Sequence, residues 1–131
     1  MRNGDFDECN FQGVNPTFVV NGKYAWTVDV INTSNIIPLR KTTASDNRME
    51  IWESNYIGVP AHSGKYLCEI NAYMFASVYQ VVPMTENSLY KWSFWHRGRA
   101  GADTARVWIN SEENSMCDVA GNMDFTDNNN E

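Results

Sequence analysis

One stretch in the second half of the chain brings large aromatic rings and cations together. Tyr90, Trp92 and Phe94 occupy alternate positions, Trp95 falls in the opposite set, and a histidine and two arginines follow within four residues. A period of two is that of a β-strand, so this pattern predicts a strand with one core-like face. The other face would offer an indole ring beside guanidinium and imidazole groups. Such groups suit a neutral sugar, because an aromatic ring covers its C–H surface and guanidinium donors reach adjacent hydroxyls.

Other predicted strands and loops supply side chains of the same types. If the strands pair antiparallel, these side chains gather on one surface of the sheet. We therefore expect a ligand-binding face with five residues from the middle of the chain and three from the aromatic stretch. The candidate ligand-binding residues are Trp52, Tyr56, His62, Glu69, Asn71, Trp95, Arg97 and Arg99. Two alternatives stay open at this point. Arg97 could pair with Glu69 inside the domain, and each aromatic side chain could belong to the core.

The sequence carries no motif that marks a catalytic centre. It has no GxSxG nucleophile elbow, no phosphate-binding P-loop and no dinucleotide fingerprint. His62 and His96 are the only histidines, and hydrogen bonding in loops accounts for them. Glu50, Glu53 and Glu69 could form a carboxylate pair by type alone, but salt bridges explain them more simply. We therefore expect a non-catalytic protein.

Acidic residues cluster near both ends of the chain. Oxygen ligands are those that calcium prefers, and the termini of a β-sandwich often lie close together. The sequence therefore predicts a structural Ca²⁺ site that draws on Asp5, Asp7 and Asp124. The spacing is not that of an EF-hand. A solvated acidic tail is the alternative for the last residues.

Composition limits the classes of partner. The chain has 131 residues, a net charge of −6 and 43% apolar residues. An acidic protein is poorly suited to phosphate backbones, so we expect no nucleic-acid binding. No run of 18 apolar residues occurs, so we expect no membrane insertion. No charged region followed by an apolar one opens the chain, so a signal peptide would be absent or already removed.

The three cysteines, Cys9, Cys68 and Cys117, are far apart in the sequence. Three thiols allow at most one internal disulfide, and their spacing is not that of a zinc site. Cys68 alternates with Tyr66 and Ile70, which favours a small buried side chain. The sequence leaves the redox state open.

The hydrophobic pattern indicates an all-β fold. Several short segments alternate apolar and polar residues, with Gly, Pro and Asn between them, and no segment shows a helical apolar stripe. We expect an antiparallel β-sandwich module over residues 1–117, followed by 118–131 as an acidic Asn-rich tail or a truncated last strand. The predicted strands are 24–31, 48–54, 65–72, 76–82, 90–95 and 103–110.

Four runs of the sequence resemble bacterial extracellular jelly-roll domains of the galactose-binding-like and carbohydrate-binding type. The most specific is HRGRAGADT at the end of the aromatic stretch, and the opening NGDFD is similar to the "NGxFE" start of such modules. The resembling runs are 49–64, 66–72, 78–80 and 93–104. The resemblance implies a jelly-roll sandwich, and it implies that Asp7 helps to hold a structural calcium.

The resemblance also implies a setting for the function. We expect a non-catalytic carbohydrate-binding-like module of an extracellular or cell-surface bacterial protein, which binds glycan on a face lined by Trp and Arg. The alternative is a structural or adhesive domain that mediates protein assembly, in a surface or phage-particle component. Such a domain would self-associate through an open sheet edge.

Overall fold

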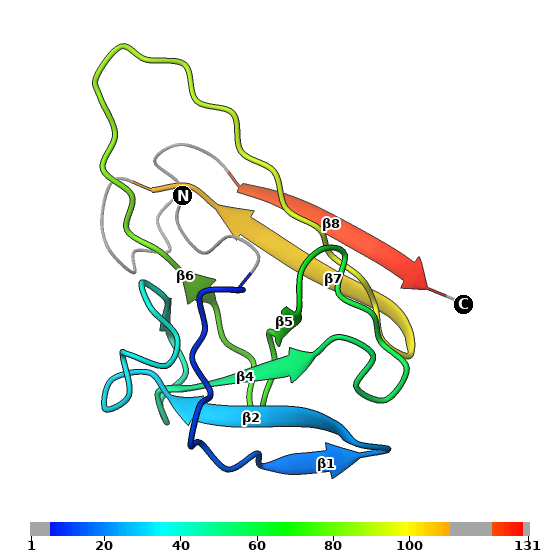
Figure 1. Cartoon of the computed structure of the whole chain (residues 1–131). Helices are drawn as coiled ribbons and strands as arrows, with labels where there is room; N and C mark the ends of the chain where they lie inside the picture. The colour runs from blue at the N-terminus through cyan, green and yellow to red at the C-terminus, as the bar shows by residue number, and fades with distance from the viewer. Residues whose placement is uncertain (1–5, 111–121, 130–131) are drawn as a thin grey trace. The chain divides into compact units, whose positions relative to one another are not determined.

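The computed structural model describes residues 6–110 and 122–129, and these residues form an all-β structure. Eight strands are present in that part of the chain, every pairing between them is antiparallel, and no helix occurs there (Figure 1). The expectation of an antiparallel all-β fold is confirmed. The chain divides into two compact units, Met1–Val82 and Pro83–Glu131, and each is described by itself.

The first unit is built on a four-stranded sheet. A two-residue turn of Asn21 and Gly22, both with positive φ, joins the first two strands, as two-residue hairpins favour. The sheet has the order β1-β2-β4-β5 (Figure 1). Its strands are β1 (Phe18–Val20), β2 (Lys23–Asp29), β4 (Arg48–Glu53) and β5 (Tyr66–Glu69), while β3 (Lys41–Thr42) pairs separately with β6 (Val78–Tyr79).

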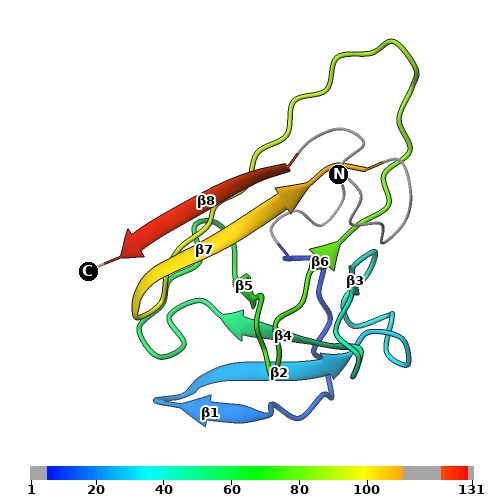
Figure 2. The same cartoon turned by 180° about the vertical axis from the view of Figure 1, so that it is seen from behind.

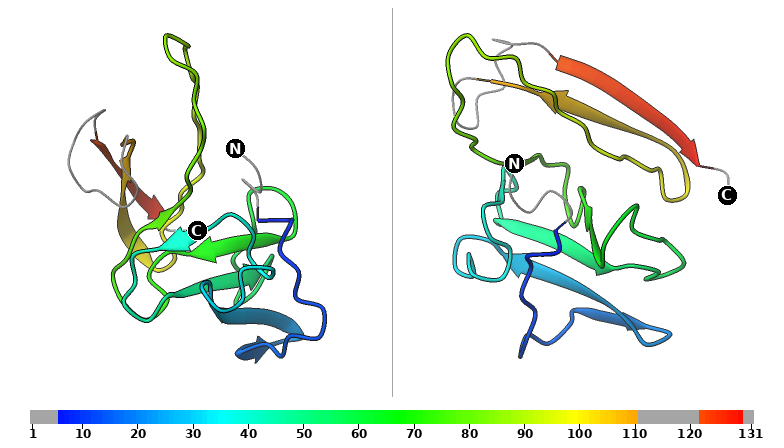
Figure 3. Two further views of the ribbon diagram at one scale, coloured as in Figure 1. Left: turned by 90° about the vertical axis from the view of Figure 1, so that its left-hand side faces the viewer. Right: turned by 45° about the horizontal axis from the view of Figure 1, so that its top comes forward.

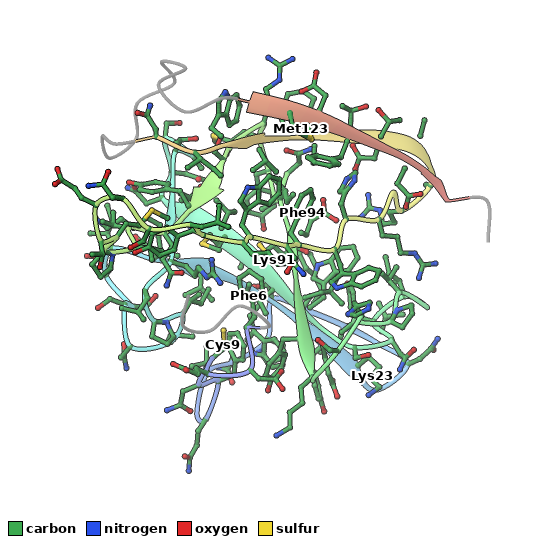
Figure 4. All side chains as sticks on the ribbon, turned by 90° about the horizontal axis from the view of Figure 1, so that it is seen from above. Phe6, Cys9, Lys23, Lys91, Phe94 and Met123 are labelled. Carbon is green, nitrogen blue, oxygen red and sulfur yellow. The ribbon has the colours of Figure 1, made fainter. Side chains whose placement is uncertain are left out.

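One face of this sheet carries the main core. Trp26 and Val28 of β2 lie opposite Ile51 and Met49 of β4, and all four side chains are buried. The segment before β1 covers them, because the Phe11 ring stacks on the Trp26 ring at 4.1 Å between centroids. Cys9 and Phe6, which the backbone bond from Cys9 N to the Phe6 carbonyl holds together, pack on the same cluster (Figure 4). The alternation predicted for residues 24–31 thus places the expected face inward.

The opposite face of the sheet is also buried over β4. Trp52 is only 2% exposed, and it packs with Ala25 and Tyr56. Its indole Nε1 donates to Glu50 Oε1 at 2.5 Å, which gives both buried polar groups a partner. The expectation that Trp52 and Tyr56 lie on a solvent-facing surface is therefore wrong. β4 is an inner strand with apolar cover on both faces, so the alternation of its residues does not mark an exposed side.

The second unit contains a ribbon of two long strands. β7 (Gly101–Trp108) pairs with β8 (Asn122–Asn129) along its whole length, and the two arrows run in opposite directions (Figure 2). The register places Ala105 opposite Phe125 and Val107 opposite Met123, which gives the ribbon one apolar face. The other face is mainly polar, with Thr104, Arg106 and their partners on β8, and it also carries Trp108.

The aromatic stretch that precedes β7 is extended but forms no strand, so the strand predicted over residues 90–95 is wrong. The stretch runs beside the β7–β8 ribbon (Figure 3), and it packs side chains on the ribbon's apolar face instead of adding a ladder to its edge. The Phe94 ring meets the Phe125 ring edge to face at 4.7 Å, and Trp92 approaches the same ring at 6.3 Å. In Figure 4 Phe94 lies between the extended stretch and the ribbon.

The division of the chain differs from the one expected. A single module over residues 1–117 was predicted, whereas the boundary between the two compact units falls in the sequence between Val82 and Pro83. For residues 118–131 a tail or a last strand was expected, and of these two the structure has a strand, β8, which pairs with β7. Two predicted strands are shorter than expected, since β5 ends at Glu69 and β6 covers only Val78 and Tyr79.

The environment of Cys68 predicts that its thiol reacts slowly in the folded protein. Cys68 packs on the main core as expected, and its thiol is enclosed although the residue keeps some exposed surface. Burial, reinforced by Glu69, raises the pKa of the Cys68 thiol to about 12. The thiolate, which is the reactive form, is therefore scarce at pH 8. We expect Cys68 to resist iodoacetamide at pH 8 in the folded protein and to react in urea, as measured by peptide mass spectrometry. Equal alkylation rates in the two conditions would contradict this burial.

Candidate functional site

The second unit has a shallow hollow of about 310 Å³ beside the β7–β8 ribbon. The end of the aromatic stretch forms one side of it, and the second half of β8 forms the other. Its lining residues are Phe94, Trp95, His96, Phe125, Thr126 and Asp127. Aromatic surface therefore lies next to a carboxylate and an imidazole in one concave place. This combination is typical of a small-molecule site in its composition.

Trp95 is the most exposed ring of the hollow. Its side chain is 75% exposed, whereas Phe94 beside it is 38% exposed and contacts Phe125. Successive side chains of an extended backbone point to opposite sides. Trp92 and Phe94 stack with each other at 5.9 Å and contact Phe125 of the ribbon, whereas Trp95 lines the hollow and exposes most of its surface to solvent. Its high exposure agrees with the predicted placement of Trp95 on the side opposite Trp92 and Phe94.

Asp127 connects β8 to the turn that leads into β7. Its Oδ2 accepts a hydrogen bond from the Gly98 backbone N–H at 3.0 Å. Gly98 is buried, and a Cβ at this position would collide with the Gly101 carbonyl oxygen and press on Asp127 and Asp103. Only glycine fits this close approach. The turn that carries the exposed Arg97 and Arg99 is thereby fixed against the ribbon.

The polar face of the ribbon is held by its own cross-strand pairs. Arg106 of β7 binds Asp124 of β8 through two hydrogen bonds, and its Nη2 donates to Asp124 Oδ2 at 2.7 Å. The Arg106 guanidinium holds the pKa of the Asp124 carboxyl below its usual range. Thr104 and Thr126 share a hydrogen bond at 2.8 Å. These groups set the register of β8 and so position Asp127 at the hollow.

The structure distributes the predicted ligand-binding residues over both units. Trp52 and Tyr56 are buried in the first unit, where Glu69 is half-buried on β5 and His62 and Asn71 are exposed in loops. In the second unit, Trp95, Arg97 and Arg99 are exposed near the hollow. Trp52 and Tyr56 are buried, so neither presents an exposed ring face, and ligand binding by the other six residues stays a prediction.

Sequence reasoning did not connect Phe125 and Asp127 to Trp95. Both lie in a segment whose acidic and Asn-rich composition favours a tail, and only the pairing with β7 brings them to the aromatic stretch. The alternation of residue types within 122–129 was the sequence signal that could have predicted a strand there. It places Met123, Phe125 and Asp127 on the same face of β8.

The predicted calcium ligands have other partners where the structure describes them. Asp5 lies outside the described residues. Asp7 Oδ1 accepts a hydrogen bond from the Lys65 backbone N–H at 2.6 Å, and Asp124 binds Arg106. Within 6–110 and 122–129, no three His, Cys, Asp or Glu side chains gather as a metal site would require. Calcium binding stays a prediction that melting with and without EDTA would check.

Comparisons of the chain with protein-family models, with curated proteins and with solved structures find no match. In the part of the chain that the structure describes, no helix is long and apolar enough to span a membrane.

The close packing around Gly98 predicts that one added carbon atom lowers the stability of the second unit. We expect Gly98→Ala to destabilise the second unit by about 1–3 kcal/mol, because the new Cβ overlaps the Gly101 carbonyl. Ala100→Ser adds one atom at an exposed position of the same turn and should leave stability unchanged. Urea unfolding followed by tryptophan fluorescence measures both variants. Equal midpoints for the two would show that the turn does not pack as described.

Proposed function

We propose that this protein is a non-catalytic carbohydrate-binding module and that it binds glycan in the hollow beside the β7–β8 ribbon. The observation that carries the proposal is the exposed Trp95 ring next to Asp127 and His96 in a concave site. The C–H face of a sugar ring is a suitable partner for an exposed indole, because each covers apolar surface of the other. The proposal concerns binding and includes no reaction.

The polar groups of the hollow complement the hydroxyls of a sugar. Asp127 uses Oδ2 for Gly98, and its carboxylate retains lone pairs that can accept from a ligand hydroxyl. The His96 ring can donate or accept. Arg97 and Arg99 extend from the adjoining turn and can donate to ring or hydroxyl oxygens. A hollow of about 310 Å³ is at the small end for ligand sites, which suits one or two sugar rings.

We also propose that the fold is a jelly-roll sandwich. Antiparallel sheets and short strands are consistent with a jelly-roll sandwich of the galactose-binding-like type, and the HRGRAGADT run supports that relation. An extracellular or cell-surface setting in a bacterial protein, with a role in adhesion, follows from it as a proposal. The acidic net charge is consistent with a neutral ligand rather than a polyanion.

Replacing Trp95 tests the proposed platform. We expect Trp95→Ala to weaken glycan binding at least about tenfold, as loss of a central aromatic anchor does. Phe75→Ala removes a ring that is 94% exposed in the first unit, and binding should be unchanged. The measurement is a glycan array followed by calorimetric titration of the best-bound sugar. Retained affinity in Trp95→Ala, with a native circular dichroism spectrum, would refute the site.

A second candidate function has its own observation. β7 and β8 form a two-stranded sheet, so each of these eight-residue strands has one edge that no other strand pairs with among the described residues. Open edges of this length can take up a strand from another chain. The same unit also exposes Leu89 completely and Met84 by 58%. A structural or adhesive role through protein assembly would use these features.

Sedimentation velocity separates the two candidate functions. We expect a monomer across a wide concentration range, because a net charge of −6 opposes self-association at low salt. A concentration-dependent dimer that Thr104→Pro abolishes would instead favour assembly through the ribbon, since proline removes a strand N–H. Thr42→Pro, on the short β3 of the first unit, is the matched control.

A further inference from the structure

A second hollow, of about 240 Å³, lies in the first unit at the end of the four-stranded sheet. Lys23 at the start of β2, Glu53 at the end of β4 and Tyr66 at the start of β5 contribute to it, and the two ends of the loop between β4 and β5 complete its wall. Figure 4 marks Lys23 at this end of the sheet. Its lining is polar, in contrast to the aromatic hollow of the second unit.

Glu53 carries the strongest signal in this hollow. Its Oε1 accepts from the Lys23 ammonium at 2.9 Å, while its Oε2 is buried and accepts no hydrogen bond within the described protein. A buried carboxylate oxygen without a donor is unfavourable by one to several kcal/mol as an order of magnitude. An O–H group in the hollow would supply the missing donor. The side chain as a whole is 28% exposed, so the carboxylate lies at the boundary between the buried part of the unit and the hollow although Oε2 itself is buried.

The wall of the hollow is held in place by bonds to distant parts of the unit. Ser54 N donates to the Lys65 carbonyl at 2.7 Å, and Lys65 N donates to Asp7 Oδ1 at 2.6 Å. Asp7 lies so close to Gly64 that a Cβ there would fall on its carboxylate. Ala61 N donates to Ser54 Oγ at 3.0 Å. A site built in this way needs little ordering when a ligand binds.

The charges around the hollow favour a neutral ligand. The Lys23 ammonium forms an ion pair with Glu53, and the Lys65 backbone N–H donates a hydrogen bond to the Asp7 carboxylate. Burial and the neighbouring Glu53 raise the pKa of the Tyr66 phenol, so it stays a protonated donor at neutral pH. Ammonium and phenol donors beside an unpaired carboxylate oxygen match adjacent hydroxyls, one of which donates while the next accepts.

We propose that this hollow is a second saccharide-binding site, in which Glu53 Oε2 accepts from one hydroxyl of a neutral sugar and the Lys23 and Tyr66 side chains donate to its neighbour. The proposal extends the proposed function by making the chain bivalent for glycan. Two weak sites on one chain raise the avidity for a polymer that presents repeated sugars, without any new contact. Asp7 contributes indirectly, because its hydrogen bond from the Lys65 backbone N–H holds the Gly64–Lys65 part of the wall in place.

Amide-resolved NMR titration tests the second site separately from the first. The probes are methyl β-D-galactopyranoside, methyl β-D-glucopyranoside and methyl α-D-mannopyranoside, and sodium acetate serves as the anionic comparison. We expect at least one pyranoside to cause saturable shifts of the Ser54, Asn55 and Lys65 amides. Saturable shifts confined to the Trp95 and Asp127 amides would overturn this inference and leave the proposed function standing. Shifts confined to the first unit would do the reverse.

Two variants assign the binding to the named groups. Glu53→Gln replaces the free acceptor and should weaken binding at the first-unit hollow at least about tenfold, the loss expected for a hydrogen bond to a charged group. Tyr66→Phe keeps the ring against Phe11 and should weaken it several-fold. Glu86→Gln makes the same chemical change in the second unit and should have no effect. Unchanged affinity in Glu53→Gln and Tyr66→Phe, or a response to acetate alone, would overturn the proposal.

Discussion

A two-stranded antiparallel ribbon is marginally stable in water, so the apolar face of β7 and β8 must be covered. Trp92 and Phe94 cover it by packing on Phe125, with the Phe94 and Phe125 rings 4.7 Å apart. Pairs of this kind contribute about 0.5–1.5 kcal/mol beyond the apolar area that they bury. Because the stretch is extended, inward Phe94 forces Trp95 outward. The exposed indole of the proposed glycan site is thus a consequence of the contact that stabilises its own unit.

The first unit places its polar chemistry by a different constraint. β4 is buried on both faces, with Met49 and Ile51 on one and Trp52 on the other, so the middle of the sheet has no surface to offer a ligand. On β4, side chains become more exposed toward the end of the strand, where Glu53 lies. Glu53 stands at that boundary, and its carboxylate is shared between the Lys23 ammonium and a polar hollow. Both proposed sites therefore lie beside well-packed aromatic or aliphatic clusters, which keep their side chains in place.

The sequence predicted the parts of this structure that depend on local alternation. The faces of β2 and the outward direction of Trp95 follow from period two alone, and they agree with the structure. The exposure of Trp52 could not be predicted, because alternation does not reveal whether an inner strand has cover on one face or on both. The strand expected over residues 90–95 failed for a related reason, since a ladder needs a partner strand and here side-chain packing replaced it. Phe125 and Asp127 reached the site only through long-range pairing with β7.

The proposed function depends on the exposed ring of Trp95. Trp95 is 75% exposed, whereas Trp26 and Trp52 of the first unit are 7% and 2% exposed, so the indole N–H signals of these two buried residues serve as internal controls. The most direct test follows these resonances while the sugar that binds best is added. The account predicts a saturable shift of the Trp95 indole signal with the Trp26 and Trp52 signals unmoved. A Trp95 signal that stays fixed while glycan binds would contradict it.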